Sequence, residues 1–183
     1  PEVRNCIFTL NRGSSASNGG AIAIYPGTSG NCSSLITDNL FISNGATNTL
    51  SGGAISITSA NGATCYVSVI SNTFVSNIAN EGGAIFIESA ASKNSSTISR
   101  NYIVGNTASS GSGILCNNAA PGDGMDIGIY DNVIANNSKE GIYVVNSSGA
   151  TTLTTCLNNT IANNSGYGVR FSGGTHLFRN NVL

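Results

Sequence analysis

The sequence predicts an all-β fold: a right-handed, single-stranded parallel β-helix, or solenoid, of about six turns with three short strands per turn. Three observations predict it: the composition, a repeat of about thirty residues, and a glycine-rich bend in each repeat. Only 8% of the 183 residues are charged while 40% are hydrophobic, so the chain can bury a core. Good helix formers are scarce, whereas Ile, Val, Thr, Gly and Asn are plentiful, which favours strands joined by tight bends.

An asparagine followed by an apolar pair recurs along the whole chain, and most copies are followed by a second asparagine five residues later. Neighbouring parallel strands lie about 4.8 Å apart, so residues at the same phase of successive turns stack on one another. Stacked asparagines can bond their amides to the backbone and to the next asparagine, which predicts a ladder at a corner of the solenoid. The first asparagine of each repeat is Asn5, Asn39, Asn72, Asn101, Asn132, Asn159 or Asn180.

Each repeat also contains a glycine-rich bend that leads into a short apolar strand. Glycine and asparagine tolerate left-handed backbone conformations at sharp corners, so Gly53 and Gly83 are predicted to be structural. Each period therefore holds one strand before the asparagine, one after it and one after the bend. The bend reads Gly-Gly-Ala-Ile in its first three copies and is weaker in the others, at 19–22, 52–55, 82–85, 111–114, 141–144 and 166–169.

Phase-matched Ile, Val and Phe residues should form continuous columns inside the solenoid, with Phe41, Phe74 and Ile103 in one of them. Turn lengths vary too much for a left-handed hexapeptide helix, and right-handed winding is the usual choice. Residues 1–183 are interpreted as one solenoid segment. Because neither end shows a polar or helical cap, we expect either flanking turns of a longer solenoid or end-to-end stacking of copies.

The paired motifs resemble those of a known group of surface proteins. Gly-Gly-Ala-Ile, together with residues 41–44 (Phe-Ile-Ser-Asn) and 74–77 (Phe-Val-Ser-Asn), is similar to the GGA(I/L/V) and FxxN motifs of chlamydial polymorphic outer-membrane proteins. Both motifs are clear together in the second and third turns. The resemblance implies an adhesin-like solenoid that is extracellular or at the cell surface. It says little about a ligand, because the motifs are structural.

Two of the five cysteines, Cys32 and Cys65, each lie seven residues before the asparagine of their repeat. Equal phase on adjacent turns predicts Cα atoms about 5 Å apart, which is within disulfide range. We therefore predict a disulfide between them, with two stacked free thiols as the alternative. Cys116 and Cys156 occupy columns otherwise held by Ile or Val and are expected in the core, whereas Cys6 is at an outward phase.

Asp123 and Asp126 form the one local cluster of carboxylates, in a glycine-containing loop. They are a weak candidate for Ca²⁺, because a complete site needs about six to eight oxygen ligands, and a solvated turn is the favoured interpretation. No other metal and no cofactor is expected. The position before the asparagine is predicted to stack opposite charges, in the pairs Arg4 with Asp38 and Arg100 with Asp131.

The charges also exclude some classes of function. Seven basic and eight acidic residues are scattered singly, so no basic face exists for nucleic acid. No apolar run approaches the roughly 18 residues of a membrane span. The eight acids fall at different phases and the single His176 lies beside no acid, so no catalytic residue is predicted.

We therefore expect a non-catalytic extracellular solenoid that acts as a surface adhesin, a spacer or a fibre-forming subunit, with a host surface or a glycan as candidate ligand. The alternative is a polysaccharide-processing or glycan-binding β-helix, since parallel β-helices also include lyases and hydrolases. Its site would lie on side loops such as 45–51, 107–112 or 117–126.

Overall fold

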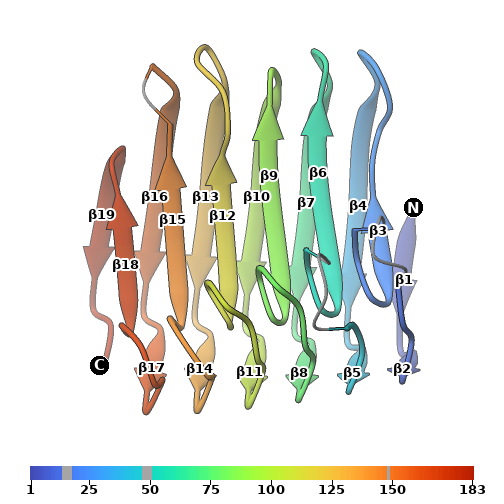
Figure 1. The fold of residues 1–183 in the computed structure, drawn as a ribbon, viewed down its shortest axis with the longest axis vertical. Helices are drawn as coiled ribbons and strands as arrows, with labels where there is room; N and C mark the ends of the chain where they lie inside the picture. The colour runs from blue at the N-terminus through green and yellow to red at the C-terminus, as the bar shows by residue number, and fades with distance from the viewer. Residues whose placement is uncertain (14–17, 47–50, 148) are drawn as a thin grey trace.

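The structure, a computed structural model, describes residues 1–13, 18–46, 51–147 and 149–183. The fold class is as predicted: the described residues contain no helix, and their strands form three parallel sheets that wind into a solenoid of about six turns. In Figure 1 the chain advances from right to left, with one sheet rising in front and another descending behind it. This sense of rotation is right-handed.

Each turn contributes one strand to each sheet, in the order A, B, C. Sheet A consists of β1 (Glu2–Arg4), β4 (Asn31–Thr37), β7 (Thr64–Ile70), β10 (Lys93–Ser99), β13 (Gly124–Tyr130), β16 (Thr151–Leu157) and β19 (Thr175–Arg179). Sheet B consists of β2 (Ile7–Thr9), β5 (Leu40–Ile42), β8 (Thr73–Val75), β11 (Tyr102–Val104), β14 (Val133–Ala135) and β17 (Thr160–Ala162). Sheet C consists of β3 (Ile22–Ile24), β6 (Ile55–Ala60), β9 (Ile85–Ala90), β12 (Ile114–Asn118), β15 (Ile142–Asn146) and β18 (Val169–Ser172).

The core consists of the predicted columns of apolar side chains. Phe41 pairs with Phe74, and Phe74 pairs with Ile103, in consecutive strands of sheet B. The rings of Phe41 and Phe74 are stacked with centroids 4.8 Å apart and planes 4° from parallel, and all three side chains are fully buried. The ring spacing equals the rise between parallel strands, so an inward residue buries its two faces against its counterparts above and below.

An asparagine ladder runs through the corner between sheets A and B. Each ladder asparagine accepts, on its Oδ1, the backbone N–H of the asparagine one turn earlier, as Asn101 does from Asn72 at 2.8 Å. The amide of Asn101 donates to the carbonyl of Val69 at 2.9 Å and to Oδ1 of Asn132 at 3.0 Å. The members are Asn39, Asn72, Asn101, Asn132, Asn159 and Asn181.

A second, parallel ladder occupies the corner after sheet B and uses the second asparagine of each repeat. Asn77, for example, donates its backbone N–H to Oδ1 of Asn106 at 2.9 Å and its amide to the carbonyl of Phe41 at 3.1 Å. The members are Asn11, Asn44, Asn77, Asn106, Asn137 and Asn164. Asn11 lies three residues after Phe8, so the first turn also carries the FxxN motif.

The residue before each asparagine of the first ladder has a left-handed backbone, with φ between 54° and 58° at Asp38, Ser71, Arg100, Asp131, Asn158 and Asn180. None of these residues is glycine, so each corner costs roughly 1–2 kcal/mol of backbone strain. The ladder offsets this cost, because the asparagine that follows bonds backbone groups which the sharp corner removes from the sheet.

The predicted phase is wrong by one residue at both ends of the first ladder. Cys6, not Asn5, pairs with Asn39, whose Oδ1 accepts the Cys6 N–H at 3.0 Å. At the other end the ladder residue is Asn181, not Asn180. An asparagine stands beside the ladder position in both cases, but strand register decides the phase, and Val3 pairs with Ile36. A one-residue shift would turn every side chain of the strand to the opposite face.

The predicted charge pairs change accordingly. Arg4 lies beside Thr37, not Asp38, and its guanidinium contacts Glu2 at 3.4 Å. Arg100 and Asp131 do share a corner position, but their side chains form no ion pair in the structure, where both residues are described. Exposed corner charges therefore contribute little to holding the turns together.

The bend glycines are required for close approach between successive turns. A Cβ on Gly53 would fall on the carbonyl of Gly83 and lie 2.8 Å from the backbone N of Ile78. A Cβ on Gly83 would lie 2.9 Å from the carbonyl oxygen of Thr107. From the fourth turn the requirement moves one position along, to Gly113 and Gly141. This shift explains why the Gly-Gly-Ala-Ile motif weakens there.

Replacing Asn101 with Ala should reduce the free energy of unfolding by about 2–4 kcal/mol, because the buried N–H of Asn72 and carbonyl of Val69 lose their partners. Chemical denaturation measures the change. The matched control is Asn181→Ala at the partly exposed end of the same ladder, where water can replace the lost bonds and the loss should be about 1 kcal/mol or less. Equal losses at the two positions would contradict a buried, cooperative ladder.

Candidate functional site

Cys32 and Cys65 form the predicted disulfide, joining the second and third turns. The two residues are directly paired between β4 and β7, and their Cα atoms are 4.7 Å apart. The bridge closes a loop across a sequence separation of 33 residues, which in the chain-entropy model stabilises the fold by about 3–4 kcal/mol. It points into the core, so its role is structural.

The other three cysteines are free. Cys116 and Cys156 lie in the core columns as predicted, and burial raises the pKa of both thiols, that of Cys156 to about 12. A thiol with such a pKa stays protonated and is a poor nucleophile. Cys6 is exposed, and its Sγ lies 3.1 Å from the carbonyl oxygen of Arg4.

The candidate calcium ligands do not converge. Asp123 is buried, and its two carboxylate oxygens accept the backbone N–H groups of Ser92 at 2.9 Å and Ala120 at 3.0 Å. Asp126 is exposed on the outer face of β13. No three His, Cys, Asp or Glu residues of the described ranges gather into a metal-binding group. Asp123 thus serves as a cap for the turn between sheets C and A.

The corner between sheets C and A holds a polar network, spread over three successive turns of the solenoid, that the sequence repeat does not predict. Ser92 donates its hydroxyl to the carbonyl of Ser59 at 2.7 Å, lies 3.0 Å from the hydroxyl of Ser89, and donates its N–H to Asp123. These residues are all buried. Serines are frequent along the whole chain, so their phase at a turn of variable length carries no visible pattern in the sequence.

Glu88 is a partly buried acid on the outer face of sheet C. Glu88 points outward from sheet C, and the amide of Asn117 donates to its carboxylate at 3.3 Å. Burial raises the pKa of Glu88, and the charges of Glu81 and Asp123 raise it further. Glu81 is held on the neighbouring connection between sheets B and C, where Ser51 Oγ donates to it at 3.4 Å.

Arg170 lies on the outer face of sheet C, at the C-terminal end of the solenoid. Its guanidinium lies 4.6 Å from the ring centroid of Tyr143 and 5.9 Å from that of Tyr167, and 3.5 Å from the carboxylate of Glu140. Glu140 also accepts the N–H of Gly111 at 3.0 Å. These contacts tie three turns together where the glycine bend is weakest, so the cluster is explained by its structural role.

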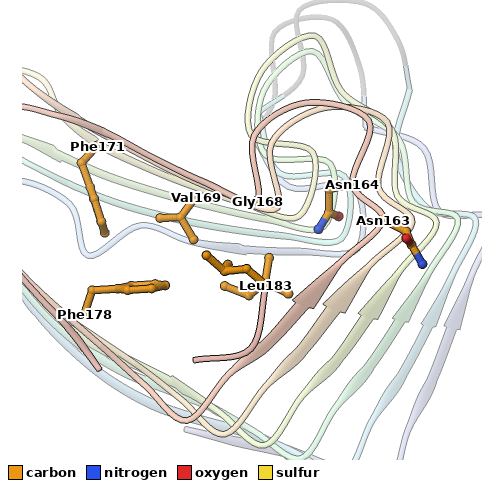
Figure 2. A pocket seen from close by; sticks show the side chains of 8 residues that line it. Asn163, Asn164, Gly168, Val169, Phe171, Phe178 and Leu183 are labelled. Atoms are coloured by element: carbon orange, nitrogen blue, oxygen red, sulfur yellow. The ribbon is translucent and has the colours of Figure 1, made fainter. Parts of the chain in front are cut away.

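The best-defined cavity, about 420 Å³, lies at the C-terminal end of the core (Figure 2). Figure 2 shows Val169 and Phe171 on one side, Phe178 on another, and Leu183 beside them. Each of these sheet residues continues a core column, for example Phe171 after Val144. The cavity is the open interior of the last turn, lined by side chains of β17, β18 and β19 and by Leu183.

The two ends of the segment do not match as surfaces. Sheet A has seven strands and sheets B and C have six, because β19 and the bridge from Val182 to Thr160 begin a further turn. If β1 of a second copy were stacked on β19, sheet C would lack one strand at the junction.

The side loops of the alternative function form parts of the regular connections. Residues 107–112 link sheets B and C, and 117–126 include the turn capped by Asp123. Of 45–51, the stretch 47–50 lies outside the described residues. His176 stacks on Phe171 at 3.9 Å and bonds the carbonyl of Gly173, so it belongs to the last turn.

Comparisons of the chain with protein-family models, with curated proteins and with solved structures find no match. Within the described ranges, no helix is long and apolar enough to cross a bilayer.

The cysteine assignments predict a graded thiol titration. Unreduced native protein should show one reactive thiol, Cys6; denatured but unreduced protein should show three, and denatured, reduced protein five. A Cys6→Ser variant should show none in its native state. Five free thiols in denaturant without reductant would remove the disulfide.

Replacing Glu88 with Gln should stabilise the protein at about pH 7, raising Tm by roughly 1–3 °C. Because the folded pKa of Glu88 is raised, its stability contribution is full below the ordinary value of 4.5 and is lost as pH rises through the folded pKa. The gain should therefore shrink toward about pH 4. Calorimetry across this range checks it, with the exposed Asp126→Asn as control. A gain that is the same at both ends of the range would refute the assignment.

Proposed function

We propose that the chain is a non-catalytic structural element: a rigid solenoid that works outside the cell or at a cell surface, as a spacer or as the scaffold of an adhesin. The observation that carries the proposal is the continuity of the two asparagine ladders and the core columns through all turns. Such a chain resists bending, because every turn is bonded to the next at two corners and three sheets.

Two further observations support the proposal. The disulfide suits an oxidising compartment outside the cytosol. The paired GGAI and FxxN motifs resemble those of chlamydial polymorphic outer-membrane proteins, a likeness that favours a surface location. We propose that the apolar surface around Val169 and Phe171 packs against further β-helical turns or against a second copy of the chain.

Rigidity can be tested by measuring a distance along the solenoid. Ser33 and Thr175 are exposed, lie in the same outward column of sheet A, and are five turns apart, or about 24 Å. Spin labels on Ser33→Cys and Thr175→Cys, in a Cys6→Ser background, should give one narrow distribution centred near that distance plus the label tethers. A broad or multimodal distribution would contradict a rigid spacer.

The polysaccharide-processing alternative is tested separately. Incubation with xylan, β-glucan and polygalacturonate should release no new reducing ends and no unsaturated products. Turnover that disappears in Glu88→Gln would replace the structural proposal with an enzymatic one.

A further inference from the structure

The outer face of sheet A carries little charge on its five inner strands, and its edge strands β1 and β19 add Glu2, Arg4 and Arg179. Its five inner strands, all described, each present four outward residues, and only Lys93 and Asp126 among these carry charge. The rest are mainly hydroxyl and apolar side chains. Those with hydroxyl groups are Ser33, Thr37, Thr64, Tyr66, Ser68, Ser95, Thr97, Ser99, Tyr130, Thr151 and Thr155. The larger aliphatic ones are Leu35, Ile70, Leu153 and Leu157.

Two tyrosines give this face a flat aromatic character. Tyr66 is 56% exposed. The Tyr130 ring lies along the sheet, over Gly128. A Cβ added to Gly128 would overlap Cε2 and lie only 2.5 Å from the hydroxyl oxygen of Tyr130. Gly128 is thus the residue that lets the Tyr130 ring lie flat. The two tyrosines are two turns apart, about 10 Å along the axis.

The arrangement of the face is regular. The five inner strands, spaced by about 4.8 Å and each seven residues long, make a surface of about 19 by 23 Å. The strands lie side by side without insertions across the face, behind sheet C in Figure 1. Side chains therefore repeat along the axis at the spacing of the turns.

We propose that the outer face of sheet A binds the flat face of a neutral, linear polysaccharide such as a β-glucan or chitin. Aromatic rings stack on the apolar faces of sugar rings, and hydroxyl side chains exchange hydrogen bonds with sugar hydroxyls. Nucleic acids and polyuronates bind to basic surfaces because counter-ions are released. This face has too few positive charges for that. The inference goes beyond the structural role, because a spacer needs no ligand.

A second copy of the chain fits this face less well than a polysaccharide does. The area of about 440 Å² per side, from the strand spacing and length, is below the roughly 800 Å² per partner of a stable protein interface. The inner strands of sheet A, all described, carry no arginine or tryptophan to anchor a protein partner. A flat polymer needs neither a pocket nor an anchor.

The test is the partitioning of the whole chain onto insoluble cellulose and chitin, with soluble polygalacturonate as the anionic probe. Wild type should bind at least one neutral polymer, and binding should be unchanged between about 0.05 and 0.5 M NaCl. Tyr66→Ala, Tyr130→Ala and Gly128→Val, which lifts the Tyr130 ring, should each reduce the partition coefficient at least about fivefold. Tyr102→Ala, on the 48% exposed tyrosine of sheet B, is the matched control and should have no effect.

Each other outcome overturns the proposal. These outcomes are no binding to either neutral polymer, equal loss in Tyr102→Ala, or binding only to polygalacturonate. Concentration-dependent dimerisation that Tyr66→Ala abolishes would assign the face to a second copy. Circular dichroism and the thiol count establish that each variant is folded. The spin-label distance is independent of this assay, so failure of the ligand proposal is distinguishable from failure of the structural one.

Discussion

The hydrogen bond from one turn's backbone N–H to the next turn's buried asparagine Oδ1 is the interaction on which the rest of the structure depends. It permits a non-glycine residue to hold a left-handed corner, as at Asp131 before Asn132, because the lost sheet bonds are replaced within the corner itself. A tight corner in turn keeps the two flanking strands in phase from turn to turn. The apolar columns then follow, since residues at one phase must stack.

This arrangement separates the parts of the chain that can vary from those that cannot. The corner between sheets A and B is short and uniform. The connections between sheets B and C and between sheets C and A differ in length from turn to turn. These connections are stabilised by interactions that occur only once: the hydrogen bond from Ser92 N–H to Asp123, and the ion pair between Arg170 and Glu140. Each interaction pairs a backbone group or a charge of its own turn, and none is needed in every repeat.

The few charged groups are mostly committed to such local tasks, which shapes the chemistry that remains available. Asp123 caps a turn, Glu140 binds a backbone N–H and Arg170, and Glu88 is left partly buried with only Asn117 donating to it. The largest regular surface, formed by the five inner strands of sheet A, carries only Lys93 and Asp126 as outward charges. A ligand there is recognised by shape, stacking and hydroxyl groups, and attraction between net charges contributes little.

The sequence by itself determined the fold class, the core columns, both sets of ladder asparagines in the inner turns, and the Cys32–Cys65 bridge. It could do so because a solenoid converts a repeat in sequence into contact between neighbouring turns. Only the tertiary structure decided that Cys6 and Asn181 complete the first ladder, since the register at an end is set by strand pairing. It also decided the contact of Asn117 with Glu88 and the Tyr130 ring over Gly128, because side-chain directions have no period that a sequence can display.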